Sequence, residues 1–376
     1  MAGSEKKELR FGFTTGSCAA AAAAGAAYML LSGRKKEKVS IETPKGIRYD
    51  AELVDIEREE RRVRCAVVKD AGDDPDITNG TKIFAEVALL DSTADAGIEI
   101  AGGIGVGTVT KPGLDQPVGN AAINHVPREM ITKEVKAMCG LFDYRGSLLC
   151  TISVPDGERL AGKTFNPRLG IVGGISILGT SGVVEPMSSQ AILDTIRAEL
   201  SVQRASGKEI VAVSPGNYGQ DYMKSAYGYD IDKSVKCSNY IGECLNYAMD
   251  LGFRKLLLTG HIGKLIKVSG GILDTHSRMG DCRMELLTAA TLIAGIDADT
   301  ARQVLSSVTT EDGLKLIKEA GLLEGSMNVV MEKVMDTLNR RADGRMQVEC
   351  IMYSNDFGCL GMSGGAMELL TALKDL

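Results

Sequence analysis

The sequence predicts two domains of mixed helix and strand, an α+β domain followed by an α/β domain with a mainly parallel sheet. The length of 376 residues is enough for two domains of ordinary size. The first half mixes helical and strand-like segments, whereas strands, glycine-containing loops and helices alternate from about Gly173 onward, and such alternation is typical of a parallel sheet. We therefore predict domains of residues 1–168 and 169–376.

The first domain is expected to begin with a helix that contains a run of alanines. Ser17, with Thr14 and Thr15 before it, can accept the unpaired N–H groups of a first helical turn. Alanines 19–24 favour the helix that follows. Further along, strand-like segments come at residues 39–41, 63–68 and 148–154, and residues 120–138 contain a second helix.

In the second domain, the expected strands lie at residues 175–178, 210–213, 255–258 and 348–353, and the expected helices within residues 188–204, 239–251, 283–294, 300–341 and 362–373. The first three strands lead into the glycine-rich loops 179–182, 214–219 and 259–264. Ordinary turns between a strand and a helix also favour glycine. Three such loops after strands of one sheet nevertheless indicate more than turns, because ligands bind outside the carboxyl ends of parallel strands.

We expect these three loops to form one cofactor site. Glycine lets the backbone approach a ligand closely, and exposed N–H groups bind anionic or carbonyl oxygens. None of the loops matches the dinucleotide-binding or P-loop pattern. The candidates for cofactor binding are Gly179, Thr180, Ser181, Gly182, Ser214, Gly216, Asn217, Gly219, Thr259 and Gly260.

Basic side chains near the third loop are candidates for substrate binding. Lys264, Lys267 and Arg278 flank glycines and small residues at the expected ligand edge, which favours recognition of carboxylates over a merely solvated surface. The helix start at Thr14, Thr15 and Ser17 is a second candidate, because a helix N-terminus offers free N–H groups and a partial positive charge. The alternative for the helix start is that capping alone explains the hydroxyls.

Charge and composition exclude several functions. With 43 Lys and Arg against 49 Asp and Glu, the formal net charge is −6, which argues against a nucleic-acid partner. Nine cysteines without a CxxC pair and three scattered histidines predict free thiols and no metal site. The apolar stretch 18–31 is shorter than the roughly 20 residues of a membrane span, and the N-terminus lacks a signal-type core. We expect a cytoplasmic protein that binds no membrane.

Two further segments allow more than one interpretation. The stretch 102–107 has the glycines of a phosphate loop, as an ATP-dependent small-molecule kinase would need, but no Lys-Ser/Thr pair follows it. A glycine-rich bend in a strand is the alternative. The acidic loop 70–76 is either a solvated turn or a segment that holds a cation or orders a neighbouring loop.

Long segments of the chain resemble the motifs of the CbiD family. In chain order they are FGFTTGSCAAAAAAGA, VVKDAGDDPDIT, GIGVGTVTKPGL, GNAAINHVPREMI, GGISILGTSGVVEPMS, SPGNYG and GHIGKLIKVSGGILDTHSR, and they lie between residues 10 and 285. The resemblance implies that the first domain is like domain 2 of ribosomal protein S5. It also implies methylation of C1 of cobalt-precorrin-5B by S-adenosylmethionine, giving cobalt-precorrin-6A in the anaerobic cobalamin pathway. The cobalt then belongs to the substrate, and no protein-bound metal is expected.

Methyl transfer to a ring carbon needs the two reacting centres held in line and a nearby proton acceptor. His261 and Glu185 are the candidate catalytic residues in the expected ligand loops. An unperturbed imidazole, with a pKa of about 6.5, suits the task with the smaller adjustment. The alternative is that His261 only fixes the loop 259–264. A non-catalytic corrinoid carrier is a third hypothesis beside the methyltransferase and the kinase, and the sequence also allows a homo-oligomer.

Overall fold

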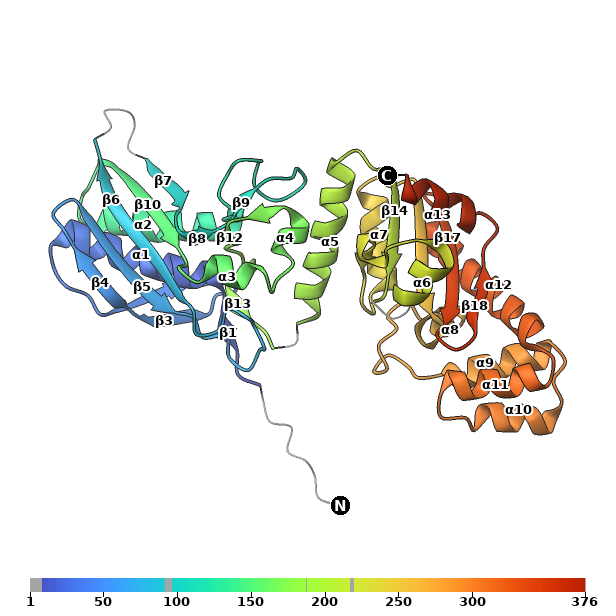
Figure 1. Cartoon of the computed structure of the whole chain (residues 1–376). Helices are drawn as coiled ribbons and strands as arrows, with labels where there is room; N and C mark the ends of the chain where they lie inside the picture. The colour runs from blue at the N-terminus through green and yellow to red at the C-terminus, as the bar shows by residue number, and fades with distance from the viewer. Residues whose placement is uncertain (1–8, 92–96, 187, 217–219, 376) are drawn as a thin grey trace, which may run out of the picture. The chain divides into compact units, whose positions relative to one another are not determined.

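The computed structural model of the chain describes residues 9–91, 97–186, 188–216 and 220–375. The chain forms two compact units, unit 1 from Met1 to Ser189 and unit 2 from Gln190 to Leu376 (Figure 1). The predicted boundary after residue 168 falls earlier than this division. The reason is that the short strands that follow residue 168 pair with strands of unit 1 and not with the sheet of unit 2.

Unit 1 is built around a five-stranded sheet with the strand order β4-β5-β6-β10-β7. Only the pair β10–β7 is parallel within this sheet; the other neighbours are antiparallel. A separate hairpin joins β2 to β3. The bounds are β2 (Lys38–Glu42), β3 (Arg48–Glu52), β4 (Val54–Arg58), β5 (Arg62–Val68), β6 (Lys82–Leu90), β7 (Ile98–Gly102) and β10 (Ser147–Ser153). A mixed sheet of this kind agrees with the predicted α+β character.

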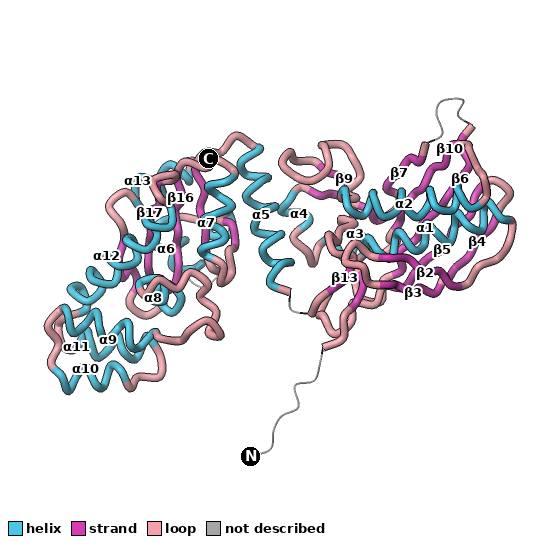
Figure 2. The backbone as a smooth tube through the Cα atoms, turned by 180° about the vertical axis from the view of Figure 1, so that it is seen from behind, coloured by secondary structure: helices cyan, strands magenta, loops and turns pink. Residues whose placement is uncertain are grey.

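Helix α1 (Thr15–Ser32) forms the centre of the unit 1 core. It packs across β5 and β6 and lies beside α2 (His125–Leu141) (Figure 2). Alanines 19–24 are fully buried, and their small side chains allow this close packing. By length and composition α1 could cross a membrane, and it is the one such helix among the described residues. Because 78% of it is buried inside the protein, it is a core helix.

The remaining elements of unit 1 are short. Three strand pairs join the end of the unit to earlier segments: β13 with β1, β12 with β8 and β11 with β9. The bounds are β1 (Gly12–Phe13), β8 (Gly105–Val106), β9 (Thr108–Val109), α3 (Gly157–Ala161), α4 (Asn166–Leu169), β11 (Ile171–Val172), β12 (Gly174–Ile175) and β13 (Val183–Val184). The segment predicted as a strand at 175–178 therefore belongs to unit 1.

Unit 2 contains a five-stranded sheet with the order β15-β14-β16-β17-β18. Its first four strands are parallel and β18 is antiparallel, as the alternation of strand and helix predicts. The strands are β14 (Ile210–Ser214), β15 (Val235–Lys236), β16 (Lys255–His261), β17 (Gln347–Ser354) and β18 (Gly358–Met362). Central strands β14, β16 and β17 are almost continuously apolar and buried, as expected of parallel strands covered on both faces.

The helices of unit 2 are α5 (Ser189–Ala205), α6 (Gln220–Tyr227), α7 (Ile241–Asp250), α8 (Ile262–Ser269), α9 (Arg283–Ile293), α10 (Ala298–Leu305), α11 (Thr310–Glu319), α12 (Leu323–Ala342) and α13 (Ala366–Lys374), with a 3-10 turn at Ile231–Lys233. Helices α9, α10 and α11 pack on one another as a small group (Figure 1). The segment 300–341, predicted as a helical tail, forms the three helices α10, α11 and α12. The start of α11 lies at the carboxyl edge of the sheet, where it contributes to the cavity described next.

Candidate functional site

A cavity of about 460 Å³ lies in unit 2 at the ends of β14, β16 and β17. Because these strands are parallel, their carboxyl ends meet at one edge, where ligands bind in such sheets. Its volume is within the range of roughly 300–1,000 Å³ that is usual for small-molecule sites. The lining includes Gly216, Gly260, His261, Lys264, Arg283 and Glu311. Pro215 and Gly216 of the second predicted loop are therefore brought together with the third loop at one cavity.

His261 ends β16 and caps the start of α8. Its Nδ1 accepts a hydrogen bond from the backbone N–H of Gly263 at 3.1 Å, so the neutral ring carries its proton on Nε2. Nε2 lies 3.2 Å from Oε1 of Glu311. Burial lowers the pKa of His261, and the carboxylate of Glu311 opposes that effect only in part. The imidazole is accordingly neutral near pH 7.

Glu311 is the main residue of the cavity that sequence reasoning missed. It lies in the first turn of α11, whose N-cap Thr309 accepts the N–H of Asp312. Its Oε2 accepts a hydrogen bond from the hydroxyl of Ser354 at 2.7 Å, whereas Oε1 is buried and makes no hydrogen bond to a described residue. The local signal is a threonine cap followed by acidic residues, which is typical of any helix start. Only the fold connects this helix start to the cavity.

Two cations line the same cavity, and each already has protein partners. The ammonium of Lys264 donates to the carbonyl oxygens of Pro215 at 3.3 Å and Ser238 at 3.2 Å. Burial lowers the pKa of Lys264. The guanidinium of Arg283 bonds both carboxylate oxygens of Asp281, at 2.6 and 2.9 Å. Lys264 is thus a predicted substrate residue that lines the cavity, and two backbone carbonyl groups already accept hydrogen bonds from it.

The other two predicted basic residues do not line this cavity. Lys267 is 4% exposed, and its ammonium donates to the carbonyl of Thr275 at 3.2 Å and lies 3.8 Å from Asp281. Those bonds tie α8 to the segment that follows it. Arg278 is exposed, and its backbone N–H donates to His276 Nδ1 at 3.1 Å. Of the two, Arg278 has the side chain that solvent can reach.

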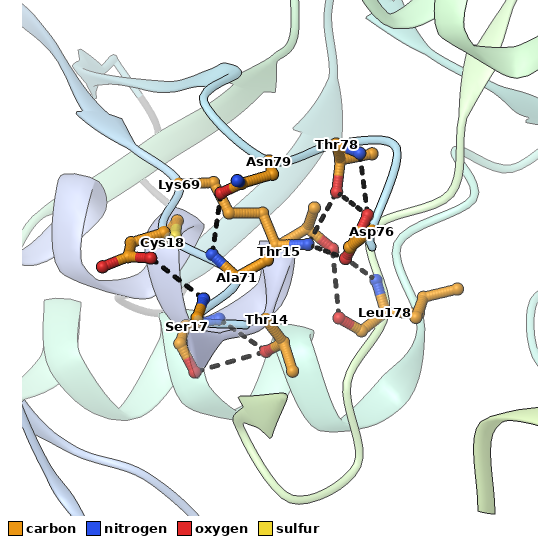
Figure 3. A network of polar contacts seen from close by, with 12 residues as sticks. Thr14, Thr15, Ser17, Cys18, Lys69, Ala71, Asp76, Thr78, Asn79 and Leu178 are labelled. Carbon is orange, nitrogen blue, oxygen red and sulfur yellow. Dashed lines mark hydrogen bonds and ion pairs between the residues drawn. The ribbon is translucent and has the colours of Figure 1, made fainter. Parts of the chain in front are cut away.

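The polar groups at the start of α1 form hydrogen bonds with other residues of unit 1 (Figure 3). Thr14 caps the N–H of Ser17, and the Ser17 hydroxyl donates to the carbonyl of Gly182 at 2.6 Å. The Thr15 hydroxyl donates to the carbonyl of Leu178 at 3.1 Å, and the N–H of Gly16 bonds that same oxygen at 3.2 Å. All three predicted side chains, Thr14, Thr15 and Ser17, are buried. Their hydroxyl groups therefore cap the helix and hold the loop 178–182 against it.

Comparison with known proteins shows close relatives along nearly the whole chain. The sequence is 46% identical to the cobalt-precorrin-5B C(1)-methyltransferase of Ruminiclostridium cellulolyticum, over 93% of this chain and 90% of the relative. Proteins of the same name from Thermoanaerobacter sp. and Methanocaldococcus jannaschii are 44% and 40% identical, over 97% and 95% of this chain and 98% and 97% of theirs. The chain belongs to the CbiD family. Its family model matches residues 2–186, and the model of the CbiD C-terminal domain matches residues 274–364.

A solved CbiD structure is also similar to this chain. It is the cobalamin biosynthesis protein CbiD of Archaeoglobus fulgidus, 30% identical, with 72% of this chain and 83% of that chain covered and a TM-score of 0.39. In the present chain, residues 2–186, which the CbiD family model matches, lie inside unit 1. Residues 274–364, which the model of the C-terminal domain matches, contain Glu311 and Tyr353 of the unit 2 cavity.

In this CbiD chain the loop 179–182 lies in unit 1, so the prediction that it follows a strand of the same sheet as the other two loops is wrong. Gly179 has φ +135°, and a Cβ there would lie 2.3 Å from the Thr14 hydroxyl oxygen. Gly182 has φ +76°, and a Cβ would lie 2.8 Å from Thr43. Thr180 is exposed, and the Ser181 hydroxyl bonds the backbone of Val183. Close packing therefore accounts for the two glycines.

Glu185 and His261, the two predicted catalytic residues, belong to different units of the CbiD chain. Glu185 follows β13 in unit 1 and forms an ion pair with Lys45. Both side chains of that pair are nearly half exposed. Unit 2 by itself therefore combines His261 with Glu311 and not with Glu185.

The other predicted cofactor residues lie in or beside the unit 2 cavity. Gly216 and Gly260 line it. Ser214 and Thr259 are fully buried in the strands that lead to it; the Ser214 hydroxyl accepts from Lys236 at 3.4 Å, and the Thr259 hydroxyl has no hydrogen-bond partner among the described residues. Asn217 and Gly219 lie outside the described residues, and their role stays a prediction.

The acidic loop 70–76 orders neighbouring segments of unit 1. Asp70 forms a two-pronged ion pair with Arg10, and Asp73 accepts the backbone N–H of Arg10 at 2.8 Å. Asp76 forms an ion pair with Lys69, whose side chain is 3% exposed (Figure 3). Among the described residues, no group of three or more His, Cys, Asp or Glu side chains is placed to hold a metal ion.

The glycines at 102–107 form a tight crossing of backbones in unit 1. A Cβ at Gly105 would lie 1.7 Å from the carbonyl oxygen of Val154, and Cβ atoms at Gly157 and Gly174 would lie 1.9 and 2.1 Å from the carbonyl oxygen of Gly105. Gly105 also has φ +72°. Three chain segments therefore meet here without side chains between them. This close packing explains why glycines are needed, and no bound phosphate has to be invoked.

Proposed function

We propose that this protein is a cobalt-precorrin-5B C1-methyltransferase that uses S-adenosylmethionine and yields cobalt-precorrin-6A in anaerobic cobalamin biosynthesis. The observation that carries the proposal is the 40–46% identity, over more than nine tenths of the chain, to proteins of that name. The S-adenosylmethionine molecule supplies the methyl group from its sulfonium centre. Holding donor and ring carbon in line contributes most to such a reaction, roughly 7–11 kcal/mol of the barrier.

The unit 2 cavity is our proposed site for the methyl donor. Its volume of about 460 Å³ suits a ligand the size of S-adenosylmethionine better than a tetrapyrrole with several carboxylate arms. Gly216 and Gly260 expose backbone on its lining, and Lys264 and Glu311 offer charges of both signs. A zwitterionic donor matches that set of groups, whereas a polyanionic macrocycle would meet the carboxylate of Glu311. For the macrocycle we propose contact with the exposed Arg278, because its guanidinium can bond a carboxylate.

Titration calorimetry with S-adenosylhomocysteine tests the donor site. The full-length protein is expected to bind this product at a single site. A Gly216→Leu variant should bind it at least about tenfold more weakly, because the new side chain fills the cavity. Gly182, a glycine of the first predicted loop, is unsuitable for such a test because its positive φ and the contact with Thr43 would strain unit 1.

Gly364→Leu is a matched control, since Gly364 lies in unit 2, lines a different hollow, and has space for a side chain: a Cβ there would have no other atom within 4 Å. Its affinity for S-adenosylhomocysteine should equal that of the parent. Binding and hydrolysis of ATP without binding of S-adenosylhomocysteine would instead identify a kinase. Binding of the macrocycle alone would identify a corrinoid carrier. Mass spectrometry of a reaction with both substrates should show the macrocycle heavier by one methyl group.

His261 and Glu185 are the proton acceptors predicted from the sequence, and the hydrogen bonding of His261 favours the alternative that it only fixes its loop. His261 can accept a proton only at Nδ1, and only by giving up the bond from the Gly263 N–H. We therefore expect a His261→Gln variant, which keeps a hydrogen-bonding group, to retain its single-turnover methylation rate within about tenfold. A general base is worth about a hundredfold or more. A loss of that size, with unchanged binding of S-adenosylhomocysteine, would assign the base to His261.

Three finer features belong to the same proposal. Unit 1 is related to domain 2 of ribosomal protein S5; its mixed sheet, covered by α1 and α2, supports this relation. The enzyme acts in the cytoplasm, in keeping with a core role for its apolar helix α1. A homo-oligomer is the remaining prediction, and sedimentation of the full-length protein measures it directly.

A further inference from the structure

The carboxylate of Glu311 has one oxygen that accepts a hydrogen bond and one that accepts none from the described residues. Ser354 donates its hydroxyl proton to Oε2 at 2.7 Å, and the Ser354 oxygen in turn accepts the N–H groups of Asp356 and Phe357 at 3.1 and 3.2 Å. These bonds fix the direction of the hydroxyl. Oε1 is buried and lies 3.2 Å from His261 Nε2; this contact partly offsets the lowering of the His261 pKa by burial, but its geometry is not that of a hydrogen bond. A buried carboxylate oxygen without a donor is costly and requires an explanation.

The positive groups around the cavity do not offset this charge. Lys264 donates to two backbone carbonyls, and Arg283 is held by both oxygens of Asp281. The ring of His261 is neutral near pH 7 because burial lowers its pKa. Asp356, the other carboxylate of the lining, is exposed to solvent. Oε1 of Glu311 is therefore a buried anionic oxygen of the cavity, on a side chain that is 22% exposed, and a ligand with an N–H donor would satisfy it.

We infer that Glu311 accepts a hydrogen bond from the α-ammonium group of the methyl donor. This inference rests on the proposed function, because it assigns the amino-acid end of S-adenosylmethionine to the Glu311 side of the cavity. An α-amino acid carries an ammonium and a carboxylate on one carbon. The lining supplies Glu311 for the first and, for the second, the N–H donors of Lys264 and Arg283 that their bonds to the protein do not use. Carboxylate arms of the macrocycle fit this position poorly, because Glu311 repels them.

A pair of ligands tests this assignment without the need for turnover. S-adenosylhomocysteine has the amino-acid end, and methylthioadenosine is a nucleoside thioether that lacks it. In a Glu311→Gln variant the amide oxygen takes the bond from Ser354, and the amide NH₂ then faces the ligand ammonium. Calorimetry should show S-adenosylhomocysteine bound at least about tenfold more weakly than by the parent. The affinity for methylthioadenosine should change less than threefold.

Glu319→Gln is the matched control, because it makes the same chemical change at an exposed position near the end of the same helix. It should leave both affinities unchanged, and thermal melts of both variants check that they fold. Equal losses for the two ligands in Glu311→Gln would place Glu311 at the nucleoside and overturn the inference, as would no loss for either. If the parent protein binds neither ligand, the proposal of a donor site in this cavity is wrong. That outcome is distinct from a failure of the Glu311 assignment alone.

Discussion

A Gly105→Ala variant is expected to lose at least about 4 kcal/mol of unfolding free energy, and we expect little folded protein at 37 °C. The new Cβ would lie 1.7 Å from the carbonyl oxygen of Val154, and that atom is backbone, which cannot turn aside as a side chain can. The residue also has φ +72°, which a side chain disfavours. Urea unfolding followed by circular dichroism measures the loss.

Gly140→Ala is the control for this substitution. Gly140 lies in α2 with no atom within 4 Å of a Cβ, so alanine should stabilise the helix by about 0.5–1 kcal/mol. If Gly105→Ala were as stable as the parent, the backbone crossing of Gly105, Gly157 and Gly174 would not be as tight as described. A phosphate loop would then again be a reasonable interpretation of residues 102–107, and ATP binding by the variant and the parent would decide it.

A Lys69→Met variant is expected to lose about 3 kcal/mol of unfolding free energy. The Lys69 ammonium is buried and donates to Asp76 and, at 2.6 Å, to the Thr78 hydroxyl. Removal of one partner leaves the carboxylate of Asp76 in a largely buried place without its counter-charge, which costs about 3–5 kcal/mol in fully buried pairs. We take the lower end because Asp76 is 23% exposed. Urea unfolding at pH 7 measures the difference.

Lys82→Met provides the comparison, because Lys82 pairs with Asp55 on the surface, where both side chains are more than 40% exposed. That change should cost less than about 1 kcal/mol. Burial raises the pKa of Asp76, but Lys69 and Thr78 outweigh it and hold the pKa below the ordinary 3.8. The stabilisation by this pair is thus present above pH 3.8 and is lost as the pH falls through the lowered value. Equal losses for the two variants at pH 7 would contradict a special role for the buried pair.

Much of the site in unit 2 could be predicted because its signals are local. A strand followed by glycines and a helix indicates a parallel sheet, and the edge at which the strands end then follows. Gly216, Gly260, His261 and Lys264 were found in this way, and the structure places all four at one cavity. Glu311 was not found, because a threonine cap and an acidic first turn are common to many helices. Nothing in the sequence near Glu311 indicates that α11 begins beside the end of β16.

The errors have a common cause in strand pairing and burial. The loop 179–182 has the same glycine pattern as the other two loops, but the strands on either side of it pair with β8 and β1 of unit 1. Lys267 and the hydroxyl of Ser17 have the chemistry of anion ligands, yet both are buried and already bonded within the protein. A side chain's chemical type is a local property, whereas its exposure depends on which distant segments cover it.

The sequence by itself determined the family, the two kinds of fold, the alanine core helix α1 and the edge of the unit 2 sheet at which the cavity lies. These depend on residue order, helix propensity and turn chemistry, which act over a few neighbouring residues. Only the tertiary structure decided where unit 1 ends, which polar groups remain open to a ligand, and that Glu311 joins His261 at the cavity. Those outcomes depend on pairing and burial between residues far apart in the chain, and the packing of the whole unit selects among the partners that local patterns allow.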